Sequence, residues 1–167
     1  MEVLGPLLAA AGIGRDRLQL RWVSSAEGQL FAEYITQLTE LIRSLGPLRR
    51  EDLKLPLAAV ERALESVPLR WLMGMERQLT ERENVFHEKL LPERYQEVLR
   101  RAAIDEYQKA LLLEVLQEGP KTVRQLADST AMPVYTVSLR LNDLERAGLA
   151  DIHGHEGANP TFRVMTA

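Results

Sequence analysis

The sequence predicts a mostly α protein of the α+β class, and three observations carry that prediction. Apolar residues recur at helical spacing through most of the chain, glycine and proline divide it into short pieces, and strand-like alternation is confined to the two ends. We expect a short strand-helix segment in residues 1–48, a helical connector in residues 49–103, and a C-terminal domain in residues 104–167 that ends in a two-stranded hairpin.

Composition narrows the class of protein further. Of the 167 residues, 46% are hydrophobic and 27% are charged, and no apolar run approaches the roughly 20 residues that cross a bilayer. The net charge of −3 gives no basic field toward nucleic acid or membrane, and the absence of cysteine excludes disulfides and cysteine-ligated clusters. The apolar start at Val3–Ala11 lacks a basic leader. We therefore expect a cytoplasmic chain that binds no membrane and carries no cofactor.

The first element that we predict is a strand. Leu18, Leu20 and Trp22 alternate with polar residues or valine, as in a strand with one buried face. A lone strand leaves its amides and carbonyls without partners. Its partner is either a further short strand of this chain or the sheet edge of another chain.

A helix follows directly. Ser24 and Glu27 have the S-x-x-E spacing of a capping box, and a wide apolar stripe then runs from Leu30 to Leu45 and stops at Gly46. In the connector, Pro68 fits a first helical turn, and apolar residues keep helical spacing.

The C-terminal third predicts three helices and a hairpin of strands. A helix stops at Gly119, Thr122 can cap a second, Pro133 begins a third, and Gly148 ends it. The expected helices carry Ile104–Leu116, Val123–Ala127 and Val137–Leu144, and the expected strands are Leu149–His153 and Thr161–Met165.

The run from Val137 to Leu149 reads V-S-x-x-L-x-x-L-x-x-A-G-L, and with the element order it resembles the winged helix-turn-helix family over residues 104–165. In DNA-reading members, one helix enters the major groove while Lys and Arg contact phosphates. Here Asp143 offsets the one arginine among the candidate contact residues of that helix, and the loop between the strands has no Lys or Arg, so we favour a protein partner over DNA. The candidate contact residues are Tyr135, Thr136, Leu139, Arg140, Asn142 and Arg163.

The run from Arg17 to Ala32 reads R-L-Q-L-R-W-V-S-S-A-E-G-Q-L-F-A and resembles the C-terminal end of the methyl-viologen-reducing hydrogenase delta subunit family over residues 1–48. The resemblance implies a small iron–sulfur subunit that passes electrons between a hydrogenase, or another dehydrogenase, and a heterodisulfide-reductase-type flavoprotein. The family's cluster cysteines precede the matched segment, and this chain has no cysteine. The docking end of such a subunit is therefore the part that this chain retains.

The candidate partner-binding residues lie in that segment. Three of them also have a purely structural explanation: Trp22 fits the buried face of a strand, Glu27 a capping box and Phe31 the helix core. The functional interpretation concerns the segment as a whole, whose strand has no evident partner. The full candidate set is Leu18, Leu20, Trp22, Glu27 and Phe31.

No catalytic motif stands out. Gly12-Ile13-Gly14 lacks the rest of a dinucleotide motif and is typical of a helix stop. His153, His155 and Glu156 can supply metal ligands if another residue converges on them, but a solvated turn explains them as well. We therefore predict no catalytic residue and no metal site.

Two functions from different classes follow. The preferred one is a non-catalytic adaptor subunit of a hydrogenase or heterodisulfide-reductase-type electron-transfer complex, which binds its protein partners through residues 18–45. The alternative is a winged-helix transcriptional regulator that binds DNA, as a homodimer formed by the N-terminal helices. A remnant of an enzyme is the third and least favoured hypothesis.

Overall fold

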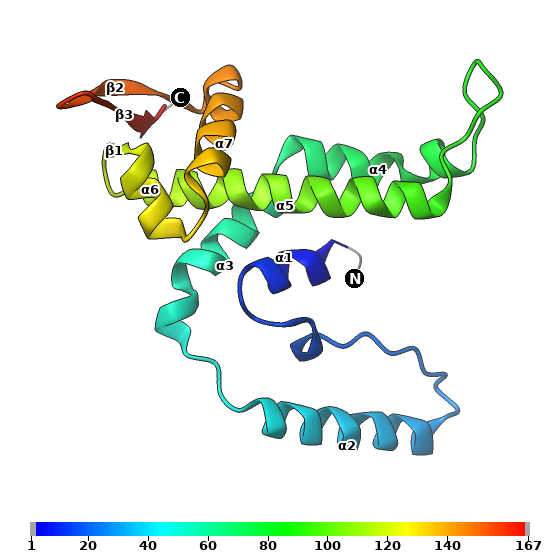
Figure 1. Ribbon diagram of the computed structural model, residues 1–167. Helices are drawn as coiled ribbons and strands as arrows, with labels where there is room; N and C mark the ends of the chain where they lie inside the picture. The colour runs from blue at the N-terminus through cyan, green and yellow to red at the C-terminus, as the bar shows by residue number, and fades with distance from the viewer. Residues whose placement is uncertain (1–2, 166–167) are drawn as a thin grey trace.

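Helices make up most of the computed structural model, which describes residues 3–165 (Figure 1). The predicted mostly α, α+β class is confirmed. The elements are α1 (Leu4–Ala10), a 3-10 turn η1 (Arg15–Arg17), α2 (Gly28–Leu45), α3 (Arg50–Leu64), α4 (Val67–Thr80), α5 (Pro92–Leu116), β1 (Lys121–Thr122), α6 (Val123–Thr130), α7 (Val134–Arg146), β2 (Ala150–Glu156) and β3 (Asn159–Val164).

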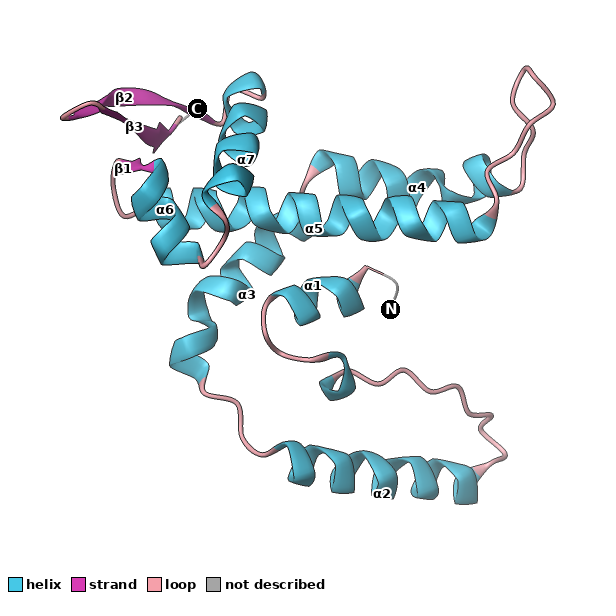
Figure 2. Ribbon diagram, viewed as in Figure 1, coloured by secondary structure: helices cyan, strands magenta, loops and turns pink. Residues whose placement is uncertain are grey.

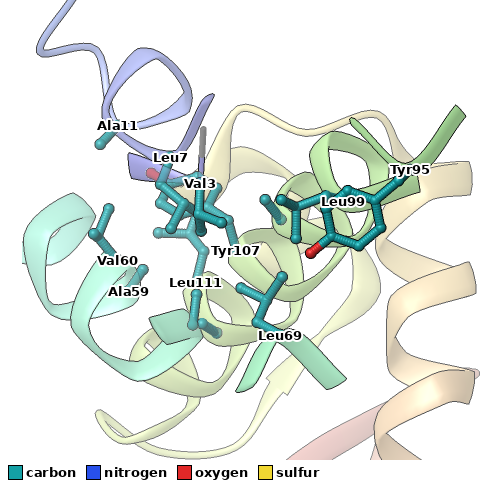
Figure 3. Packing of buried hydrophobic residues seen from close by; sticks show 13 residues of the cluster. Val3, Leu7, Ala11, Ala59, Val60, Leu69, Tyr95, Leu99, Tyr107 and Leu111 are labelled. Carbon is teal, nitrogen blue, oxygen red and sulfur yellow. The ribbon is translucent and has the colours of Figure 1, made fainter. Parts of the chain in front are cut away.

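The long helix α5 takes part in two hydrophobic cores. Its residues from Tyr95 to Leu111 pack against α1, α3 and α4, and Figure 3 shows Leu7, Leu69 and Tyr95 in this first core. Its last turns pack against α6, α7 and β3 in a second core, which includes Leu112 and Leu141. The boundary that we expected between residues 103 and 104 lies inside this continuous helix.

The C-terminal part has the topology of a winged helix. Its three strands are ordered β1-β3-β2 and pair antiparallel, with Phe162 opposite both Lys121 and Ile152. The two predicted wing strands are confirmed, but they extend to a tight turn at Gly157, where φ is 61° and a loop over Gly154–Pro160 was expected. The sequence analysis missed β1, because a two-residue strand has no period to detect.

Helix ends in this part form as their residues predict. Thr122 and Gln125 make a reciprocal capping box: the Thr122 amide donates to Gln125 Oε1 at 2.7 Å, and the Gln125 amide donates to Thr122 Oγ1 at 3.3 Å. Gly148, with φ of 68°, follows the last residues of α7 and allows the chain to turn into β2.

The predicted N-terminal strand is wrong. Residues 18–23 are extended, but within the described residues their backbone makes no hydrogen bond to another backbone group. None of the described strands lies beside them, because the segment packs along α2 instead. Trp22, expected on a buried strand face, has 84% of its surface exposed.

The predicted helix after this segment is confirmed as α2, but its details differ. The Glu27 carboxylate accepts from the Ser24 amide at 2.8 Å, whereas the Ser24 hydroxyl accepts from Ala26 and not from a helix amide. Only half of the expected capping box is therefore formed. Phe31, expected in the helix core, is 54% exposed, and α2 buries none of its residues.

Candidate partner-binding surfaces

The first candidate surface is the N-terminal hairpin, which we define as residues 15–45. Its extended segment runs antiparallel to α2: Arg17 Nη2 donates to the Leu45 carbonyl at 2.8 Å, and the Arg21 guanidinium lies 5.4 Å from the centre of the Tyr34 ring. A shallow groove of about 220 Å³ lies between the segment and the helix. The groove is lined by Gln19, Arg21, Val23, Phe31, Tyr34, Ile35, Gln37, Leu38 and Leu41.

Alternation along the segment separates two sets of side chains. Gln19, Arg21 and Val23 line the groove toward α2, whereas Leu20 and Trp22 are outside it and exposed. The predicted period of two is therefore present, but a helix takes the place of the expected sheet. Of the five candidate partner-binding residues, Leu20, Trp22 and Phe31 are exposed apolar side chains, Leu18 is half-buried, and Glu27 holds the turn before α2.

The hairpin is weakly attached to the rest of the molecule. Within residues 3–165, the side chains of residues 16–46 hydrogen-bond only to groups in that same range. Figure 2 shows α2 apart from α4–α7 and joined to the body by loops at both ends. The two loops contain Gly12, Gly14 and Gly46, all with positive φ.

The second candidate surface is the outer face of α7, where the structure gives Arg140 a structural position. Its guanidinium is held by three side chains: Nε donates to Gln108 at 2.9 Å, Nη1 to Asp143 at 2.9 Å and Nη2 to Asp105 at 2.5 Å. The Arg140 side chain is only 14% exposed. Two carboxylates thus neutralise it, and it fastens α7 to α5.

Sequence analysis missed two of these three partners. Asp105 and Gln108 are three residues apart on α5 and so share one face of that helix. The sequence signal for these two partners was therefore a carboxylate and an amide three residues apart on the helix against which α7 packs. Finding it required knowing which faces of α5 and α7 meet.

Apart from the exposed Arg146, the rest of the α7 face is neutral or apolar. Tyr135, Leu139 and Asn142 are exposed, and Thr136 is half-buried. Arg163, the remaining candidate contact, is exposed on β3 in register with Asp151 of β2. Phosphate binding depends on cations that are free to face the ligand, and this face presents few.

The residues present do not fit an iron–sulfur cluster. The chain has no cysteine, and within residues 3–165 no group of three or more His, Cys, Asp or Glu side chains is placed to hold a metal ion. His153 and His155 lie exposed on β2. In the same range, no helix combines the length and the apolar character that spanning a membrane requires.

Comparison with known families gives two partial matches and confirms both resemblances. Residues 1–46 match the family described as methyl-viologen-reducing hydrogenase, delta subunit, and residues 108–151 match the arsR family of bacterial regulatory proteins. The chain thus joins a hydrogenase-delta-like segment to an arsR-like winged helix.

A particular relative sharpens the first match. The chain is 42% identical over 50 residues to an iron-sulfur subunit of the F420-non-reducing hydrogenase from Archaeoglobus profundus. The aligned part is 30% of this chain and 36% of the relative, so the chain spans about a third of that relative's length. No solved structure matches the chain.

Proposed function

We propose that this protein is a non-catalytic adaptor subunit of a hydrogenase or heterodisulfide-reductase-type electron-transfer complex. One observation carries the proposal: a hydrogenase-delta-like hairpin exposes its apolar side chains in a chain without cysteine. In this function the hairpin holds a protein subunit of the complex. Electrons pass through the partner subunits and not through this chain.

The exposure of Trp22 and Leu20 supports a docking role. A tryptophan side chain offers about 150–250 Å² of surface, and covering apolar surface contributes roughly 25 cal/mol per Å². Buried aromatic anchors also dominate the binding energy of many protein interfaces. Within this chain Trp22 contributes little to folding, because most of its surface stays in water.

The test is affinity purification of the tagged full-length chain from its native host, followed by mass spectrometry. We expect subunits of an oxidoreductase in the eluate of the unmodified chain. Trp22→Ala should reduce their recovery roughly tenfold or more, since it removes the largest exposed side chain of the docking segment. Trp71→Ala is the matched control, because Trp71 is the chain's other tryptophan and is half-exposed on α4, outside the hairpin.

Two results would overturn the adaptor proposal. One is recovery of the chain without any oxidoreductase subunit. The other is equal loss of partner with Trp22→Ala and Trp71→Ala, which would show that the hairpin has no special role.

A DNA-binding regulator is the second candidate, and the arsR match over residues 108–151 favours it. It predicts salt-sensitive retardation of duplex DNA, weakened by Arg163→Glu, which reverses an exposed charge on the wing. No retardation of genomic fragments at low salt would eliminate it. Arg140 is unsuitable for this test, because its replacement also removes the contacts between α7 and α5.

A further inference from the structure

One side of α2 carries a largely exposed apolar row, which we call the α2 row. Its members follow each other at intervals of four, three, four and three residues, so they form one stripe along the whole helix. The extended segment lies along the neighbouring flank of the helix, where Tyr34 and Leu41 are half-buried, and three members of the row also line the groove between segment and helix. The row consists of Phe31, Ile35, Leu38, Ile42 and Leu45; all but the half-buried Leu38 are exposed, and Ile35 is 47% exposed.

The row is complementary to itself. Phe31 and Leu45 lie seven residues on either side of Leu38, and Ile35 and Ile42 lie three and four residues from it. A second α2 laid antiparallel, with the two Leu38 side chains facing each other, therefore sets Phe31 of each copy against Leu45 of the other. Ile35 then faces Ile42 across the same axis.

Charge does not oppose this arrangement. At 100° per residue, the charged residues Glu33, Glu40 and Arg43 lie on the face of α2 opposite Leu38. Antiparallel packing also sets the two helix dipoles in opposite directions, which is the favourable arrangement. Helix α2 also stands apart from α4–α7 (Figures 1 and 2).

We infer that a second copy of this chain covers the α2 row, through an antiparallel pair of α2 helices related by a twofold axis near Leu38. A twofold interface needs only one surface that complements itself, and it is the commonest symmetry among soluble oligomers. The exposed side of the extended segment, with Leu20 and Trp22, lies outside the row. A dimer therefore covers Phe31 but leaves Leu20 and Trp22 of that segment exposed to another protein.

The first test is the mass in solution of the full-length chain. For a small interface with micromolar affinity we expect a dimer at about 100 µM, twice the 18.9 kDa of the chain, by size-exclusion chromatography with light scattering. The double variant Ile35→Glu with Ile42→Glu should run as a monomer. Leu57→Glu is the control, because it changes an exposed leucine of α3 in the same way and should leave the dimer intact.

The second test uses the absence of native cysteine, which makes single introduced cysteines unambiguous reporters. An antiparallel pair predicts that Phe31→Cys and Leu45→Cys chains form a disulfide with each other when mixed. Each variant alone should cross-link poorly. A parallel pair predicts the reverse, since identical positions then face each other.

A monomeric unmodified chain at about 100 µM overturns the inference, and so does a dimer that survives the double glutamate variant. Efficient cross-linking of each cysteine variant alone overturns the antiparallel geometry. The outcome is separable from that of the adaptor proposal, because partner recovery depends there on Trp22 and the dimer depends here on Ile35 and Ile42. Circular dichroism of the double variant checks that its helices are retained.

Discussion

Helices α2 and α7 are both amphipathic, yet they have opposite surroundings. The 13-residue α7 buries Val137, Leu141 and Leu144 almost completely, whereas the 18-residue α2 buries nothing. Three elements close in sequence, α5, α6 and β2, cover α7, whereas the main contact of α2 is the short segment that precedes it. Periodicity therefore predicts a helix, whereas burial depends on whether the same chain supplies a cover.

Removing a buried leucine should separate the two helices most strongly. Leu141→Ala should lower the free energy of unfolding by about 2–5 kcal/mol, because it leaves a cavity in the second core. Leu38→Ala on α2 should cost less than about 1 kcal/mol, since the hairpin lies outside both cores. Urea unfolding followed by circular dichroism measures both. A cost for Leu38→Ala equal to that for Leu141→Ala would place the hairpin in the cooperative core.

The next effect concerns charged contacts of the two helices. Arg140→Ala should cost about 1–2 kcal/mol, because it leaves the Asp105 and Asp143 carboxylates without their cation on a partly screened surface. Arg146→Ala, on the exposed side of the same helix, should change stability by less than about 0.5 kcal/mol. Arg21→Ala in the hairpin removes one exposed contact with Tyr34 and should cost less than about 1 kcal/mol. Equal effects of Arg140→Ala and Arg146→Ala in urea unfolding would contradict the anchoring role of Arg140.

The caps at the starts of α6 and α2 should differ by a smaller amount in their contribution to stability. Thr122→Ala should cost about 1 kcal/mol, because it removes a complete capping box before α6. Ser24→Ala should be nearly neutral, since the Ser24 hydroxyl accepts only from Ala26, at 3.4 Å in an exposed turn. Thermal unfolding of the two variants compares them, and a larger loss from Ser24→Ala would contradict the half-formed cap described above.

The smallest effect appears only at alkaline pH, in the first core. Burial raises the pKa of Tyr107 above its ordinary value of 10.0. Since the unfolded chain releases this proton first, the contribution of Tyr107 to stability is complete below pH 10.0 and declines as pH rises through the higher pKa of the folded state. Tyr107→Phe should therefore flatten the fall in unfolding free energy above that pH. A fall of the same steepness in the variant would assign the alkaline loss to other groups.

The sequence predicted the winged helix well because its signals are local. The Thr122 cap, the buried stripe of α7 and the two wing strands are each determined by residues within one turn or one strand of each other. Their partners also lie within about 60 residues, so pattern and packing agree.

The prediction of an N-terminal strand failed because the segment packs along a helix and does not pair with another strand. Leu18, Leu20 and Trp22 do alternate, but alternation reports only that two faces differ and not what lies beside the strand. A helix covers one face here and water the other, which put Trp22 outside. The pairing of Arg140 with Asp105 was missed for a related reason, since the sequence pattern does not show which faces of α5 and α7 meet.

Helix α5 joins the two hydrophobic cores of the molecule. One part of this 25-residue helix packs against α1, α3 and α4. The other end packs against α6 and α7. Because both cores are built on one continuous helix, the residues between them set the orientation of the winged helix relative to α1, α3 and α4. Inserting one residue near Ala103 would turn the two ends by about 100° relative to each other and set them out of phase.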